Sequence, residues 1–146
     1  MTVTRAQIVA SAREWIGTPW HHQERVKGEG CDCAGVVLGV AWEHELTAFD
    51  FRAYDRVPDG HTLQALCDTH MARIALDDAQ PGDVALIRFA AYPQHLAVFG
   101  DYPHGGLSLI HALNRSAAKD SRVVEHRLDT VWRMRIVQAY RLPGVI

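Results

Sequence analysis

Apolar residues in the first part of the chain recur every three or four positions, the spacing that places them on one face of a helix. The first such run comprises Ile8, Val9, Ala12, Trp15 and Ile16. Thr4 followed three residues later by Gln7 is the pattern of a capping box, which indicates where this helix begins. Gly17 and Pro19 predict where it ends.

A second helix is predicted over residues 33–44. Its apolar face comprises Val36, Val37, Val40 and Ala41. Gly35 and Gly39 lie one turn apart within this helix, where glycine costs about 1 kcal/mol against alanine. Two glycines on one stripe therefore predict that another element packs very close to this helix.

A third helix is predicted over residues 61–74, where side chains that can be buried again recur at helical spacing. They are Leu63, Leu66, Cys67, His70, Met71 and Ile74. The polar, glycine-containing segment 21–30 is predicted to be a loop that leads to the second helix. The segment 49–60, which contains Tyr54, is predicted to be irregular.

Beyond Pro81 and Gly82 the pattern changes to that of β-strands. One nearly continuous apolar run and several alternating runs predict strands over 83–89, 94–99, 107–113, 122–126 and 136–141. A short helical turn is predicted over 129–132. Helices followed by strands with short turns predict an α+β fold, with N-terminal helices packed on a C-terminal antiparallel β-sheet. We expect residues 1–146 to form a single domain, since domains commonly contain ~100–200 residues.

The composition is that of a globular protein and indicates no polyanionic partner. Of the 146 residues, 48% are hydrophobic and 22% are charged, which argues against disorder. With a net charge of −2, no strong field favours nucleic acid or an anionic membrane as a partner. The sequence starts without the pattern of a signal peptide, and no apolar run approaches the ~18 residues of a membrane span. We therefore expect synthesis in the cytoplasm and no membrane insertion.

The stretch from Gly28 to Val40 carries the candidate nucleophile. A glycine-containing loop leads into Cys33, and the helical pattern begins at this residue. The unpaired N–H groups and the dipole at a helix N-terminus favour negative charge, so we expect the thiol pKa of Cys33 to be lowered. Because the thiolate is the nucleophilic form, this position favours a cysteine hydrolase, which also needs a base and a group that orients the base.

Two histidines on alternating strands are candidates for the base and the group that orients it. A hairpin centred near Pro103 would place Phe99 opposite Leu107 and His95 opposite His111. The two histidines would then lie side by side on one otherwise apolar face of the sheet. We assign His95 as the base and His111 as the residue that accepts a hydrogen bond from it. The reverse assignment of these two roles also fits the pattern.

Structural interpretations compete with these chemical ones. Cys33 could be a buried structural thiol, since free cysteine is among the most buried residue types. A zinc site would draw on Cys31, Cys33, Cys67, His21 and His22. Structural zinc sites use two ligand pairs, and C-x-C without a second cysteine pair fits this poorly, so we expect no metal. The other cysteines and most tryptophans are predicted to be packing residues: Cys31, Cys67, Trp15, Trp42 and Trp132.

Five short motifs follow one another along the chain. They are Gly17-Thr18-Pro19-Trp20, Gly30-Cys31-Asp32-Cys33-Ala34-Gly35, Pro81-Gly82-Asp83, Gln94-His95-Leu96-Ala97-Val98 and Leu109-Ile110-His111-Ala112. In this order they resemble the NlpC/P60 cysteine peptidases, and the resemblance covers nearly the whole chain. The stretches 122–126 and 140–143 are similar to those of short, single-domain members found in phages and phage-like gene-transfer particles.

The resemblance implies a papain-like α+β fold and cleavage of bacterial cell-wall stem peptides, usually after D-glutamate and before a diamino acid. Cys33 matches the nucleophile of the family, His95 its base and His111 its third polar residue. No metal or organic cofactor is implied. The resemblance thus assigns to these three residues the roles that their positions already favour.

Three further positions bear on the substrate. Asp32 matches a residue that helps to hold the free amine of the substrate peptide. Trp20 stands where the family commonly has a tyrosine that can reach the substrate or the oxyanion, and it keeps one N–H donor without the hydroxyl. Ala34 stands where serine is frequent, so this substrate-binding position lacks the usual hydroxyl. The substrate is therefore less well defined than the reaction.

The predicted function is hydrolysis of an amide bond in peptidoglycan stem peptides, of the D-glutamyl–diamino acid endopeptidase type. The resemblance to phage-type members implies incorporation in a phage or phage-like tail, through which the enzyme would reach the cell wall. One alternative is an amidase or acyltransferase on the same scaffold. Another is a non-catalytic structural subunit of a tail.

Overall fold

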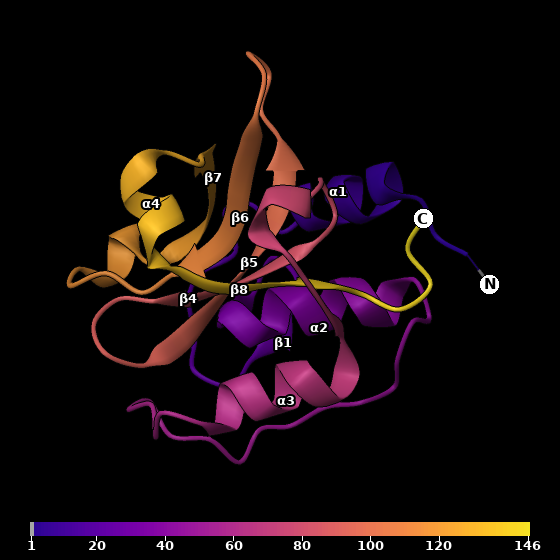
Figure 1. Ribbon diagram of the computed structural model, residues 1–146. Coiled ribbons are helices and arrows are strands. Elements are labelled where there is room, and N and C mark those ends of the chain that lie inside the picture. The colour runs from indigo at the N-terminus through magenta and orange to yellow at the C-terminus, as the bar shows by residue number, and fades with distance from the viewer. Residues whose placement is uncertain (1) are drawn as a thin grey trace.

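The computed structural model describes residues 2–146 and is built around a six-stranded antiparallel sheet in the order β3-β8-β4-β5-β6-β7 (Figure 1). The strands are β3 (Ala72–Ile74), β4 (Val84–Arg88), β5 (Pro93–Asp101), β6 (Leu107–Leu113), β7 (Arg122–Arg127) and β8 (Ile136–Arg141). The five predicted strands correspond to β4 to β8. A separate two-stranded hairpin pairs β1 (Arg25–Val26) with β2 (Gly30–Cys31).

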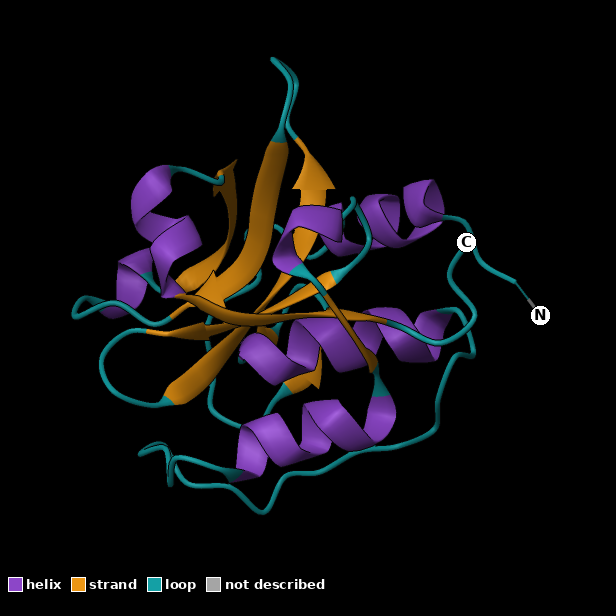
Figure 2. Cartoon of the chain, in the orientation of Figure 1, coloured by secondary structure: helices purple, strands orange, loops and turns teal. Residues whose placement is uncertain are grey.

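Helices lie on both sides of the large sheet (Figure 2). Three of them contribute to the core on one face: α1 (Arg5–Arg13), α2 (Cys33–Glu43) and α3 (Thr62–His70). The short α4 (Thr130–Arg135) packs against the other face, through Trp132. Single 3-10 turns occur at Leu76–Asp78 and Ala118–Asp120. The predicted α+β fold with helices packed on an antiparallel sheet is confirmed.

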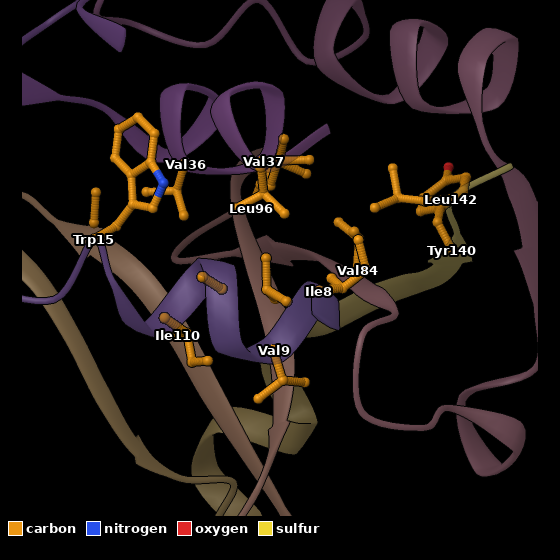
Figure 3. Close-up of a cluster of buried hydrophobic side chains, with 14 of the residues drawn as sticks. Ile8, Val9, Trp15, Val36, Val37, Val84, Leu96, Ile110, Tyr140 and Leu142 are labelled. Atoms are coloured by element: carbon orange, nitrogen blue, oxygen red, sulfur yellow. The ribbon is translucent and has the colours of Figure 1, made fainter. Parts of the chain in front are cut away.

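Alternation along the strands divides the core into two clusters, because successive side chains of a strand point to opposite faces. Toward α1 and α2 the sheet presents one set of residues, part of which is drawn in Figure 3: Val84, Leu86, Leu96, Val98, Ile110 and Tyr140. Toward α4 it presents another set: Ala85, Ile87, Ala97, Phe99, Leu109 and Ala139. The strands are therefore apolar on both faces. The nearly continuous apolar run over 83–89 is typical of such a strand.

The capping box at the start of α1 is present in full, since the Thr4 side chain accepts from the Gln7 backbone and the Gln7 side chain accepts from the Thr4 backbone. The helix ends at Arg13, earlier than Gly17 and Pro19 predicted. Successive turns follow, with Thr18 N–H donating to the Trp15 carbonyl at 2.9 Å. These turns keep Trp15 in the core while Ile16, expected on the buried face, is 45% exposed.

The two glycines of α2 are sites of close approach, as predicted. A Cβ on Gly35 would collide with the Glu24 carbonyl oxygen, and one on Gly39 would collide with the Trp15 ring. The first neighbour is backbone and the second is a buried ring, so neither can move away easily. The glycine stripe therefore lets the residues before β1 and after α1 lie directly against α2.

The prediction of a helix over 61–74 is wrong at its end, because residues 72–74 form β3. The chain becomes extended at Met71, and Ala72 then pairs with Arg141 of β8. Pairing with the edge of the sheet overrides the helical spacing of the apolar residues. The predicted loop 21–30 likewise contains β1 and most of the β1–β2 hairpin.

A buried carboxylate joins α1 to the sheet. Asp83, which follows Pro81 and Gly82 in one of the motifs, is 0% exposed and accepts from Arg5 at 2.8 Å and from Arg141 twice at 3.0 Å. The two ends of the described chain also meet, through a parallel bridge between Val3 and Val145 (Figure 1). Among residues 2–146, no helix has the length and apolar character needed to cross a membrane.

Candidate active site

Cys33 is the first residue of α2, as predicted, and its thiol lies beside β5. Asp32 caps the helix by accepting from the Gly35 backbone N–H at 2.9 Å. The backbone N–H groups of Leu96 and Ala34 are directed at the Cys33 sulfur. Leu96 directly follows His95, so Cys33 lies beside the backbone of β5 at this point, but no hydrogen bond within residues 2–146 joins Cys33 to the His95 side chain, which contacts His111 instead.

The expected lowering of the Cys33 pKa is not found. Burial is the largest influence and Asp32 the second, and together they raise the pKa of the Cys33 thiol to about 12. The backbone N–H groups of Leu96 and Ala34 act in the opposite direction but are outweighed. The thiol is therefore neutral in the resting protein, so the helix N-terminus does not by itself produce a thiolate.

Cys33 lies in a cleft of about 460 Å³ whose walls are mainly apolar. The segment that follows α2 provides much of this wall, including Phe49, Phe51 and Val57, and α3 adds Leu63 and Leu66. Ala34, Gln94 and Leu96 contribute near Cys33. Within residues 2–146, the lining does not include Trp20, Asp32, His95 or His111.

His95 and His111 are in contact, with His95 Nε2 2.6 Å from His111 Nδ1. The predicted register of the β5–β6 hairpin is nevertheless wrong by two residues, because Phe99 pairs with Leu109 instead of Leu107. The turn spans Tyr102 to Gly106 and so is centred one residue later than predicted. A shift of two residues keeps both histidines on the same face and makes them diagonal neighbours, which histidine side chains can bridge.

Both histidines are buried, with exposed fractions of 5% for His95 and 0% for His111. Burial, aided by the nearby His126, lowers the pKa of His95 to about 3. Burial is also the main reason why the pKa of His111 is lowered, with further contributions from His95, His126 and Arg115. Both imidazoles are therefore neutral near pH 7, the form in which one ring nitrogen can accept a proton.

Asp32 organises the loop before α2. Its Oδ1 accepts from Arg25 Nη1 at 2.8 Å as well as from the cap, and its Oδ2 accepts from the Gln23 backbone at 2.8 Å and from the Tyr54 hydroxyl. The Arg25 and Asp32 side chains are 1% and 5% exposed. A contact between Asp32 and a substrate amine stays a prediction, and it requires that the amine replace one of these donors.

Trp20 forms an isolated parallel bridge with Cys31. Its backbone N–H donates to the Ser121 carbonyl at 2.8 Å, and its indole stacks against His22 and under the Arg56 guanidinium. His21 is exposed and His22 half-buried. The proposed roles of Trp20 and Ala34 toward substrate stay predictions, with Ala34 the one that lies in the cleft wall.

The other two cysteines are core residues, as predicted, with Cys31 0% and Cys67 3% exposed. Trp15 is also buried in the core, and the Trp42 indole N–H donates to the Phe49 carbonyl at 2.8 Å. In residues 2–146 there is no group of three or more histidine, cysteine, aspartate or glutamate side chains arranged to hold a metal ion.

Three residues near the site were missed from the sequence. His126 on β7 contacts His111, with 2.7 Å between their Nε2 atoms, and Arg25 and Tyr54 hold Asp32. The sequence placed His126 on a strand over 122–126, but the pairing of this strand with the one that carries His111 was not predicted. Arg25 and Tyr54 lie in segments without a periodic pattern, so nothing in the sequence connected them to Asp32.

The fold is similar to those of solved NlpC/P60 structures. The NlpC/p60 domain of the peptidoglycan hydrolase SagA has a TM-score of 0.63 and 24% identity, covering 96% of this chain and 100% of that chain. A Staphylococcus aureus protein described as similar to a lipoprotein of the NLP/P60 family has a TM-score of 0.64 and 17% identity over 94% of this chain. A Bacillus cereus NlpC/P60 family protein has a TM-score of 0.69 and 16% identity over 97%.

This chain spans 41% of the length of each of the latter two proteins. No family model matches the sequence, and no curated protein matches it either. The likeness at these identities establishes the fold: residues 2–146 adopt the NlpC/P60 fold.

Proposed function

We propose that this protein is a cysteine peptidase of the NlpC/P60 family that hydrolyses an amide bond in peptidoglycan stem peptides. The observation that carries the proposal is the position of Cys33, at the start of α2, in a cleft and beside the strand position of His95. The hydrogen bond between His95 and His111 supports it, because it supplies a base and an orienting group. The neighbour SagA is itself a peptidoglycan hydrolase, which agrees with this substrate class.

In the proposed reaction, Cys33 Sγ attacks the amide carbonyl carbon while its proton passes to His95. Both groups are neutral at rest, so the thiol proton has to pass to His95 for the attack to occur. The carbon–nitrogen bond then breaks, and the proton held by His95 goes to the leaving amine. Water, activated by the same histidine, hydrolyses the thioester and releases the free carboxylic acid and the Cys33 thiol.

The charge that develops on the carbonyl oxygen needs hydrogen-bond donors. We assign the backbone N–H of Cys33 as one donor and either Trp20 Nε1–H or a nearby loop donor as the second. A backbone N–H at the first position of a helix has no intrahelical acceptor and so is free to bind the oxyanion. His111 orients His95 throughout the cycle.

The bond that is cleaved is inferred from the motifs around Cys33 and His95, which match enzymes that act between D-glutamate and a diamino acid. Asp32 is the candidate contact for the amine of the stem peptide. We also propose that the protein acts as part of a phage-like tail, on the basis of the stretches 122–126 and 140–143. Immunodetection in purified particles tests this association, and absence from particles that contain the other tail proteins contradicts it.

The apolar walls of the cleft support a second candidate, an amidase or acyltransferase that takes an apolar acyl group. This reaction also uses Cys33, so only product analysis distinguishes the two. A panel that contains muropeptides and medium-chain acyl amides and esters would give stem-peptide fragments in the first case. In the second case it would give free or transferred acyl groups.

The experiment that tests the proposal is digestion of purified cell-wall fragments by the native protein and by Cys33→Ala, with products identified by mass spectrometry. We expect shortened stem peptides with the native protein and none with the variant. Cys31→Ala is the matched control, since Cys31 is a buried cysteine two residues away, outside the lining of the cleft. Equal products from the native protein and Cys33→Ala would overturn the mechanism.

A further inference from the structure

The histidine pair continues into a third histidine and ends at a backbone carbonyl. His95 Nε2 lies 2.6 Å from His111 Nδ1, and His111 Nε2 lies 2.7 Å from His126 Nε2. His126 Nδ1 in turn lies 2.9 Å from the Arg127 carbonyl oxygen. The chain of hydrogen bonds therefore runs across three neighbouring strands, β5, β6 and β7.

The carbonyl end determines the direction of every bond in this chain. A carbonyl oxygen only accepts, so His126 Nδ1 must carry a proton, and a His126 ring that carries this proton alone accepts at Nε2. His111 accordingly donates from Nε2 and accepts at Nδ1. His95 must therefore donate from Nε2, which leaves the lone pair of His95 at Nδ1. The burial that disfavours charge on His95 and His111 agrees with neutral rings at these two positions.

Aromatic side chains pack around the three rings. Trp132 of α4 lies edge-on to His111, with 5.0 Å between the ring centroids, and its ring centroid is 4.9 Å from that of His126. The ring centroids of Phe89 and His95 are 5.0 Å apart. On the sheet, His126 pairs with Leu109 and so is the diagonal neighbour of His111, just as His111 is of His95.

We propose that His126 is a positioning residue, which with the Arg127 carbonyl fixes the tautomers of His111 and His95 so that His95 Nδ1 accepts the Cys33 proton. The part that concerns Cys33 rests on the proposed function. The part that concerns the tautomers rests on the hydrogen bonds alone. Without His126, His111 loses the acceptor that keeps its proton on Nε2. The proton of His111 can then move to Nδ1, where it would face the N–H of His95 Nε2 and break the hydrogen bond between the two rings.

The tautomers are measured directly by nitrogen NMR of the protein labelled with ¹⁵N-histidine, without any substrate. In the native protein we expect His95 to be protonated at Nε2 and unprotonated at Nδ1. His126→Gln places an amide oxygen near the position of the former Nε2, so His95 should keep its proton on Nε2. His126→Leu offers no acceptor to His111, so His95 should become a mixture of its two tautomers. A native His95 protonated at Nδ1, or an unchanged His95 in His126→Leu, would overturn the proposal.

Hydrolysis of cell-wall fragments gives the second readout. We expect His126→Leu to lower kcat about tenfold or more with little change in KM, and His126→Gln to restore most of the loss. His104→Leu, which alters an exposed histidine in the β5–β6 turn, is the control and should leave kcat unchanged. If the native protein hydrolyses nothing but shows the expected tautomers, the proposed function fails and the positioning role stands. If His126→Leu fails to fold, a native His95 that is protonated at Nδ1 still overturns the proposal.

Discussion

At Cys33, the start of a helix and the burial of the thiol act on the pKa in opposite directions. The helix position is visible in the sequence, and two backbone N–H groups do favour the thiolate. Burial and the Asp32 carboxylate, held in place by Arg25 and the helix cap, outweigh them. The extent of this burial depends on the tertiary packing around the thiol and could not be predicted from the sequence, which explains why the position was correct and the charge state was not.

The thiol reactivity of Cys33 follows from this charge state. Because the thiolate is the reactive form and the pKa of Cys33 is raised to about 12, we expect slow alkylation by iodoacetamide at pH 7. The rate should rise about tenfold per pH unit through pH 9, as measured by mass spectrometry of the peptide that contains Cys33. A rate that is already high and constant from pH 6 upward would indicate a stable thiolate and contradict the neutral resting pair.

At the scale of the elements, alternation predicted the faces of the strands better than their register. His95 and His111 belong to the same face in any register shifted by two residues, so their contact survived an error in the turn. The short strand at Ala72–Ile74 could not be recognised, because only its pairing with β8 makes it extended. Local patterns thus predict which elements are amphipathic, while pairing partners and turn geometry decide where each begins and ends.

The close approach at Gly39 can be tested by adding a single methyl group. Gly39→Ala improves helix propensity by about 1 kcal/mol but forces the new Cβ into the Trp15 ring, which is 4% exposed. Overpacking commonly costs ~1–3 kcal/mol, so we expect a lower free energy of unfolding in urea.

The control is the same substitution in a Trp15→Leu background, where the ring is absent and alanine should be neutral or stabilising. The account of the glycine stripe is wrong if Gly39→Ala is as stable as the native protein when Trp15 is present.

At the scale of the whole molecule, the sheet separates two environments. Its α1–α2 face carries the larger apolar cluster, and its other face carries the buried histidines next to α4. The order of helices before strands was sufficient to predict this α+β arrangement. That the histidines lie under Trp132 was not predictable, since the short α4 appeared in the sequence only as a helical turn. The buried, neutral histidines make the stability of the entire fold dependent on pH.

We expect the free energy of unfolding to fall as the pH drops below about 6.5. In this range the unfolded chain binds protons at His95 and His111 and the folded protein does not, because their folded pKa values are lowered. Stability is therefore fully present above the unfolded pKa and decreases by about 1.4 kcal/mol per pH unit for each histidine, down toward pH 3 for His95.

Urea unfolding between pH 7 and pH 4 measures this slope. His95→Gln, which does not titrate, should reduce the slope by about half, whereas the exposed control His104→Gln should leave it unchanged. An equal slope in the native protein and in His95→Gln would show that His95 is not responsible for the acid sensitivity.

The most direct test of the central claim is to trap the covalent intermediate on Cys33. The native protein is mixed with stem peptide, quenched in acid within the first turnover and analysed by intact mass, followed by mapping of the modified residue. We predict a mass increase equal to the acyl part of the peptide, located on Cys33 and absent from Cys33→Ala. Stem-peptide cleavage by both proteins, with no adduct on Cys33, would contradict the claim that this thiol is the nucleophile.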